Sequence, residues 1–128
     1  MAVTKPLLKC LVADDELQIG MLVREALFQQ GYDSDVVSDG DQAARMLAQG
    51  EYSLIVSDVM MPCKTGVELV HDLRARGVLT PVVLMSSYLS EETLFSCSAL
   101  EHLAFLQKPF ALSDLRQAVS RATSSVRC

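Results

Sequence analysis

The sequence lacks any apolar run that approaches the length of a membrane span, which is about 20 residues. Its first apolar residues are interrupted by Lys5, Pro6 and Lys9, so we do not expect a signal peptide. Basic residues are few, with 11 lysines and arginines against 16 acids and a formal net charge of −5. Nonspecific nucleic-acid binding needs a basic patch. We therefore expect a cytoplasmic domain with no direct contact to nucleic acid or membrane.

The sequence also lacks the paired cysteine spacings of zinc sites and disulfide-rich folds. The four cysteines, Cys10, Cys63, Cys97 and Cys128, are scattered and form no CxxC motif. Reduced thiols are expected, with Cys10 and Cys97 in or near the core and Cys128 exposed. Internal repeats, linkers and low-complexity stretches are absent too. A chain of 128 residues suits one core, so we expect residues 1–128 to form a single domain with no output domain.

What the sequence does contain is a repeated alternation of short apolar runs and helical patterns. Continuous apolar strands that alternate with helices are typical of an α/β fold, in which a doubly wound parallel sheet carries helices on both faces. Ligands of such sheets bind beyond the carboxyl ends of the strands, where the strand order reverses. The expected strands are residues 7–13, 35–38, 54–56, 82–85 and 103–106.

Polar residues mark the expected helix starts. Asp39 is followed by Gln42, and Thr65 by Glu68, in the spacing of capping boxes. Ser90 is expected to cap a fourth helix that runs to about residue 100. Ser113 is the expected N-cap of the last helix.

Charged and hydroxyl side chains follow four of the expected strands. Asp14, Asp15 and Glu16 follow the first, Asp58 the third, Ser86 the fourth and Lys108 the fifth. Mg²⁺ prefers carboxylate and phosphate oxygens, and a carboxylate can also attack a phosphoryl donor. Lysine and hydroxyl groups would stabilise the phosphoryl oxygens. These residue types predict Mg²⁺-dependent phosphoryl transfer to an aspartate, with Glu16 as an ordinary first-turn acid.

Taken together, these motifs resemble the receiver domain of two-component response regulators, which has the chemotaxis-type receiver fold. The resemblance covers nearly the whole chain and implies a five-stranded, flavodoxin-like sheet of order 2-1-3-4-5. The motifs that carry it are Asp14-Asp15, Asp58-Val59-Met60-Met61-Pro62 with Gly66, residues 81–86, and Phe105-Leu106-Gln107-Lys108-Pro109-Phe110.

The resemblance also implies a role for each site residue. Asp58 would be the phosphoacceptor, and Ser86 and Lys108 would contact the phosphoryl group. Mg²⁺, for which Mn²⁺ would be a substitute, would be held by Asp58, by Asp15 directly, by Asp14 through water, and by the backbone carbonyl of Met60.

The same resemblance implies a switch and its partners. Ser86 and Phe105 would be the switch residues that remodel the face formed by the fourth helix, the fifth strand and the fifth helix. The phosphoryl group would come from a histidine kinase or a phosphotransfer protein. The altered face would bind a downstream protein or a fused output domain, neither of which the sequence identifies. The chain would then be no enzyme for other substrates, since it would catalyse only its own phosphorylation and dephosphorylation.

Some positions depart from the family pattern. Ser86 stands where threonine is commoner, and Glu101-His102 replace a common Gly-Ala before Phe105, which makes the turn before the fifth strand harder to predict. Leu103 and Ala104 replace acids through which one subgroup dimerises, so we do not expect that mode of dimerisation.

Two alternative functions have to be weighed against phosphorylation. A receiver-like interaction module that is never phosphorylated would have lost an acid, the hydroxyl or the lysine, and all are present here. A phosphohydrolase with an aspartate nucleophile would need a second acid two residues later, where this chain has Met60.

Overall fold

The chain folds as a five-stranded parallel sheet of order β2-β1-β3-β4-β5. The computed structural model describes residues 7–124, so the prediction for Cys128 lies outside the described residues. The sheet confirms the predicted doubly wound α/β fold and strand order. Its strands are β1 (Leu8–Ala13), β2 (Tyr32–Val37), β3 (Leu54–Asp58), β4 (Val82–Ser86) and β5 (Leu103–Gln107).

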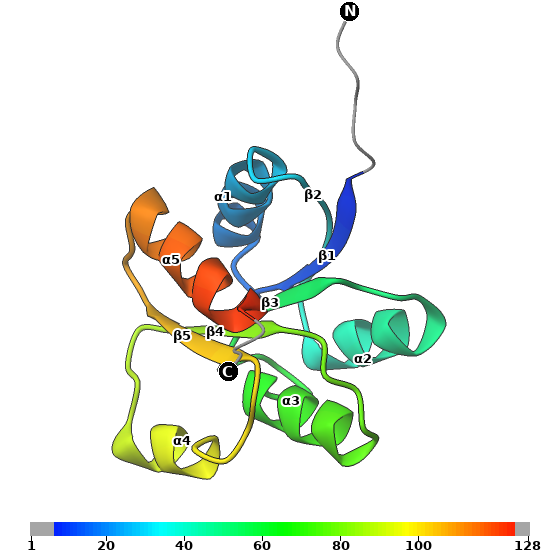
Figure 1. Ribbon diagram of the computed structural model, residues 1–128, viewed down its shortest axis with the longest axis vertical. Helices are drawn as coiled ribbons and strands as arrows, with labels where there is room; N and C mark the ends of the chain where they lie inside the picture. The colour runs from blue at the N-terminus through cyan, green and yellow to red at the C-terminus, as the bar shows by residue number, and fades with distance from the viewer. Residues whose placement is uncertain (1–6, 125–128) are drawn as a thin grey trace, which may run out of the picture.

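Within the described residues, four helices connect successive strands, a fifth follows β5, and together they cover both faces of the sheet. In Figure 1, α1 and α5 lie above the sheet, and α2, α3 and α4 lie below it. No helix within the described residues is long and apolar enough to cross a bilayer. The helices are α1 (Leu17–Phe28), α2 (Gly40–Gln49), α3 (Gly66–Ala75), α4 (Glu91–Ser96) and α5 (Leu112–Thr123).

Three of the predicted helix starts are confirmed by their hydrogen bonds. The Asp39 carboxylate accepts from the backbone N–H of Gln42 at 2.8 Å. Thr65 and Glu68 form a complete capping box at the start of α3. Ser90 caps α4 by accepting from the N–H of Thr93 at 3.0 Å. Each cap satisfies a donor that would otherwise lack a partner in the first helical turn.

Three predicted boundaries were wrong. Helix α5 begins at Leu112 and has Ala111 as its N-cap, so Ser113 already lies inside it. The local signal was Asp114, whose carboxylate accepts from the Ala111 N–H at 3.0 Å. Helix α4 ends at Ser96, because the next residue, Cys97, turns into the core and is 3% exposed.

The third boundary concerns β2, which begins at Tyr32 rather than at Asp35. Asp33 and Ser34 are polar, so no continuous apolar run marks the first half of this strand. The strand lies at one edge of the sheet and, within residues 7–124, pairs with β1 alone. Asp33 is exposed at this edge, whereas Ser34 is buried.

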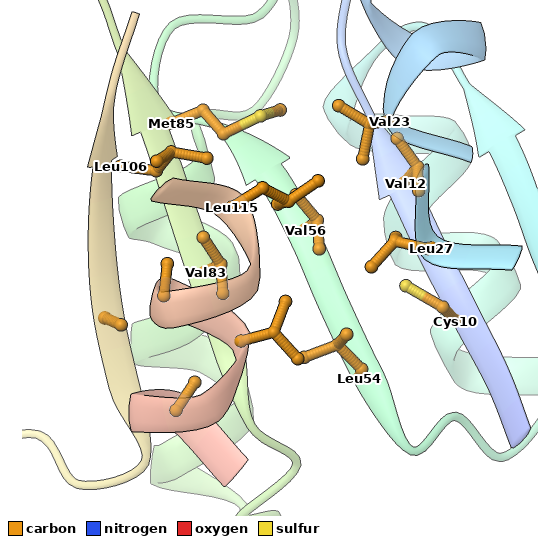
Figure 2. Close-up of a cluster of buried hydrophobic side chains, with 14 of the residues drawn as sticks. Cys10, Val12, Val23, Leu27, Leu54, Val56, Val83, Met85, Leu106 and Leu115 are labelled. Atoms are coloured by element: carbon orange, nitrogen blue, oxygen red, sulfur yellow. The ribbon is translucent and has the colours of Figure 1, made fainter. Parts of the chain in front are cut away.

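Two apolar clusters hold the layers together, one on each face of the sheet. The first joins α1 and α5 to the strands and includes Val12, Leu27, Val56 and Leu115 (Figure 2). The second joins α2 and α3 to the opposite face. As predicted, Cys10 and Cys97 are buried, one in each cluster. Burying a side chain such as Leu115 stabilises the fold by about 1.5–3 kcal/mol, so the two clusters fix the positions of the strand ends.

The two ends of α2 offer a test of how closely this helix packs against the loop after β3. A Cβ atom at Gly40 would overlap the backbone carbonyl of Lys64, whereas one at Gly50 would make only ordinary contacts. We expect Gly40→Ala to lower the free energy of unfolding by about 1–3 kcal/mol. Gly50→Ala is the matched control, because its backbone is extended with φ −141° and accepts any residue.

Urea denaturation followed by circular dichroism measures both variants. Gly50→Ala should match or slightly exceed the wild type in stability. Equal losses in the two variants would contradict the close approach at Gly40.

Candidate functional site

The predicted site residues gather at the carboxyl ends of the strands. Strand order reverses at β1 and β3, because the chain moves from β1 outward to β2 and then crosses to β3 on the other side. An open cleft of about 620 Å³ lies there, and its lining includes Asp15, Asp58, Met60, Ser86 and Lys108. Side chains that are up to 94 residues apart in sequence therefore meet in one place.

Lys108 links the two buried acids of the cleft. Its Nζ donates to Asp14 Oδ2 at 2.9 Å and to Asp58 Oδ2 at 3.0 Å. The Asp14 side chain is fully buried, and those of Asp58 and Lys108 are 10% and 13% exposed. Burial by itself would lower the pKa of Lys108, but its bonds to Asp14 and Asp58 outweigh burial and raise it. Lys108 is therefore a cation at neutral pH, placed to neutralise charge beside Asp58.

Asp58 ends β3, where the strand delivers its carboxylate to the floor of the cleft. Burial raises the pKa of Asp58, and hydrogen bonding and charge from Lys108 offset part of that rise. The backbone N–H of Met60 donates to Asp58 Oδ1 at 3.2 Å. The carboxylate is thus fixed through both oxygen atoms, while the exposed Met60 side chain lies at the cleft.

Asp14, Asp15 and Asp58 bring their carboxylates close together. Each offers one oxygen atom, and these atoms lie within 4.8 Å of one another. The Asp14 carboxylate also accepts from the backbone N–H of Glu16 at 2.8 Å, which fixes its orientation. Three carboxylates around one point form a donor set that is compatible with a hard divalent cation.

Glu16 belongs to the site in a way that the sequence analysis missed. Its Oε1 lies 3.7 Å from Lys108 Nζ, although its side chain is 68% exposed. Glu16 is the extended N-cap of α1 and makes no capping hydrogen bond through its side chain. The available signal was its position directly after Asp14-Asp15, in the loop that leaves the end of β1. Its contact with Lys108 is long and exposed to solvent, and therefore weak.

Ser86 lies in the cleft, but its hydroxyl is bound elsewhere. It donates to the backbone carbonyl of Tyr88 at 2.8 Å and accepts from the Tyr88 N–H at 3.0 Å. Both bonds hold the start of the loop between β4 and α4 against the end of β4. In this arrangement Ser86 is near Asp58 without contacting its carboxylate through a hydrogen bond.

Phe105 lies on the same face of the sheet as Ser86. Strands β4 and β5 pair in register, with Leu84 opposite Phe105 and Ser86 opposite Gln107. Side chains two residues apart share a face, so Ser86, Leu84 and Phe105 all point toward the layer of α3 and α4. Phe105 is partly buried there and packs against the second apolar cluster. The two predicted switch residues therefore lie on one face of the sheet. Lys108 lies beyond the end of β5 and does not share that face.

Comparison with known proteins adds an independent view of this chain. The family model described as "Response regulator receiver domain" matches residues 10–120. The response regulator protein PmrA of Pseudomonas aeruginosa is 31% identical over 118 residues, which cover 91% of this chain and 52% of PmrA. The chain thus spans about half the length of that relative.

Solved structures show the same likeness. The chemotaxis response regulator CheY4 of Vibrio cholerae superposes with a TM-score of 0.79 at 28% identity, covering 91% of this chain and 98% of CheY4. The receiver domain of the Francisella response regulator 1452 gives a TM-score of 0.77 at 31% identity, covering 94% of this chain and 99% of that domain.

The position of Lys108 predicts a pH-dependent effect of its removal. Lys108→Met would leave the carboxylates of Asp14 and Asp58 buried without their cation, which costs about 3–5 kcal/mol when an ion pair is fully buried. Loss of Lys108 would raise the pKa of Asp58 further above its ordinary value of 3.8. The folded variant would then hold a proton that the unfolded chain has released, so its stability would fall as pH rises above that ordinary value.

We therefore expect the stability deficit of Lys108→Met to be large at pH 7 and smaller at pH 5, measured by urea denaturation. Lys9→Met is the control, because its ion pairs with Asp33 and Asp35 are exposed, at 3.7 and 3.4 Å. Such pairs contribute less than about 1 kcal/mol. An equal deficit of Lys108→Met at both pH values would show that Lys108 acts by packing and not by charge.

Proposed function

The chain belongs to the response regulator receiver domain family, and we propose that it accepts a phosphoryl group on Asp58 from a histidine kinase or a phosphotransfer protein. One observation carries the proposal. A buried carboxylate stands at the end of β3, held from one side by the Lys108 ammonium and from the other by the Met60 N–H. A nucleophile fixed in this way needs little reorganisation to attack a donor that enters the cleft.

The proposed reaction is an in-line displacement at phosphorus. A bond forms between an Asp58 oxygen and phosphorus as the bond from phosphorus to the donor's imidazole nitrogen breaks, and the nitrogen keeps the electron pair. Lys108 remains close enough to neutralise negative charge on the transferred group. The chain would act only on itself, catalysing its own phosphorylation and dephosphorylation, and would not turn over other substrates.

The acids of the cleft fit a divalent cation, and we propose Mg²⁺, with Mn²⁺ as a substitute. Asp15 and Asp58 would hold it directly, Asp14 through water, and the Met60 backbone carbonyl would complete the protein ligands. Bound Mg²⁺ supplies positive charge that stabilises phosphoryl oxygens. The support is the donor set itself, in which three carboxylates converge while a single ammonium offsets their charge.

The same site would act as a switch. A phosphoryl group on Asp58 adds oxygen acceptors for the Ser86 hydroxyl, which would have to leave Tyr88 to reach them. Phe105 would then move into the space that the Ser86 hydroxyl leaves on that face of the sheet. The change would reach the surface formed by α4, β5 and α5, which would bind a downstream protein or a fused output domain. We place the protein in the cytoplasm, where histidine kinases present their phosphoryl groups.

The surroundings of the cleft favour a protein as the phosphoryl donor. Helix α1, which begins directly after Glu16, carries exposed apolar side chains at Leu17, Met21 and Leu22, which are 63%, 44% and 54% exposed. Apolar side chains gathered beside a site favour contact with another protein surface. Ile19 and Phe110 extend this apolar surface into the cleft itself.

Phosphorylation is tested directly with a small donor. With acetyl phosphate and Mg²⁺, intact-mass measurement should show one added phosphoryl group on the wild type and none on Asp58→Asn. Removal of Mg²⁺ with EDTA should also abolish the adduct. If the wild type gains no phosphoryl group while remaining folded, Asp58 is not a phosphoacceptor and the interaction-module alternative is favoured.

The lifetime of the phosphorylated form can be tested at Met60. Its side chain is 68% exposed at the cleft and has no group that can orient an attacking water molecule. We expect slow self-dephosphorylation in the wild type and a shorter phosphoryl half-life in Met60→Asn, followed by intact mass over time. Met60→Leu is the control and should keep the half-life of the wild type. An unchanged half-life in Met60→Asn would exclude this explanation.

A further inference from the structure

Helix α4 contributes no buried side chain of its own, although Cys97 directly after it lies in the second apolar cluster. None of the six residues of α4 is buried, and Phe95 is 80% exposed. In Figure 1 this short helix lies at the lower left, at the margin of the layer that it shares with α3. Its position depends on the buried Cys97, on the 3.0 Å hydrogen bond between the His71 ring and the Ser96 carbonyl, and on how the two ends of the segment that carries it are attached.

One end of the segment is attached through Ser86, whose hydroxyl binds the Tyr88 backbone. The other end is attached through Arg74, in the last turn of α3. Arg74 Nε and Nη2 donate to the Glu101 carbonyl at 3.2 and 2.9 Å, and Nη2 also donates to the His102 carbonyl at 3.2 Å. Its Nη1 donates to the Val78 carbonyl at 2.9 Å. One planar guanidinium thus ties the end of α3 to the turn that leads into β5.

The turn that Arg74 holds contains an unfavourable backbone conformation. His102 has φ +59°, in the left-handed region that residues with a Cβ atom rarely adopt. Such a conformation persists where neighbouring groups fix it. The hydrogen bond from Arg74 to the His102 carbonyl is one such constraint. Arg74 is itself partly buried, so water competes less for its bonds than at an open surface.

We propose that Arg74 is a positioning residue that holds the α4 segment in its resting place through Glu101 and His102. The inference rests on the proposed phosphorylation of Asp58, since movement of the segment away from this place is what phosphorylation would cause. Phosphorylation would then have to break the hydrogen bonds of Arg74 as well as those between Ser86 and Tyr88. Without Arg74, more of the unphosphorylated chains would already have left the resting arrangement, and a ligand that selects the other arrangement would bind more tightly.

Beryllium fluoride, which occupies the place of a phosphoryl group on an aspartate, is the probe. In the presence of Mg²⁺, Arg74→Met should bind it about fivefold more tightly than the wild type, as expected if the resting state alone loses roughly one net hydrogen bond. Hydrogen exchange of the free variant should be faster at residues 91–102. Arg76→Met is the matched control, because Arg76 is exposed and, among the residues that the structure describes, its side chain bonds only to the Asp72 carbonyl in α3.

Two further variants separate positioning from a general loss of stability. Glycine adopts a left-handed backbone without steric cost, so adding His102→Gly to Arg74→Met should return the affinity toward that of the wild type. Arg74→Lys keeps the charge but cannot reach both connected segments, and it should fall between the wild type and Arg74→Met.

If Arg74→Met and Arg74→Lys lower the melting temperature but leave the affinity for beryllium fluoride unchanged, Arg74 is only structural and the inference is wrong. The proposed function fails if the wild type itself binds no beryllium fluoride and gains no phosphoryl group from acetyl phosphate. That result does not depend on the hydrogen-exchange rates of the Arg74 variants.

Discussion

The Lys108 Nζ lies between two buried carboxylates, 2.9 Å from Asp14 and 3.0 Å from Asp58. Buried acids of like charge would repel one another and take up protons if no cation lay between them. The Lys108 ammonium offsets this repulsion, although burial still keeps the pKa of Asp58 raised. The charge that balances these acids is thus the same charge that would stabilise an incoming phosphoryl group, so the stability of the cleft and its chemistry depend on one contact.

The sheet makes that contact possible, because parallel strands deliver their carboxyl ends to one edge. Asp14 directly follows β1, Asp58 is the last residue of β3, and Lys108 directly follows β5. The pairing register of β4 and β5 then directs Ser86 and Phe105 toward the layer of α3 and α4. The proposed phosphoacceptor and the proposed switch residues are therefore neighbours that face different layers, so a phosphoryl group on Asp58 would have a short path to the opposite face of the sheet.

Helices α5 and α4 also differ in how firmly they are held. α5 buries Leu115, Ala118, Val119 and Ala122, whereas α4 buries no residue of its own and is attached by polar contacts and by the buried Cys97 that follows it. Hydrogen bonds of this kind can be exchanged for others at small net cost, whereas a packed apolar core resists displacement. Under the proposed function, a segment held largely by the polar contacts of Ser86 and Arg74 would move more easily than one anchored in the core along its whole length.

The fold class could be predicted from the amino-acid sequence, and so could the acids, the hydroxyl and the lysine that follow the strands, because apolar periodicity and short motifs are local signals. The strand order was predicted through the family resemblance. The sequence also determined three helix starts through their capping residues. It did not determine the ends of α4 and α5, where a buried Cys97 and the Asp114 carboxylate decide the boundary. Only the tertiary structure showed that Glu16 faces Lys108, that the Ser86 hydroxyl is engaged by Tyr88, and that Arg74 holds the turn at His102. These contacts join residues through side-chain direction and pairing register, which depend on how the layers pack and leave no periodic trace in the sequence.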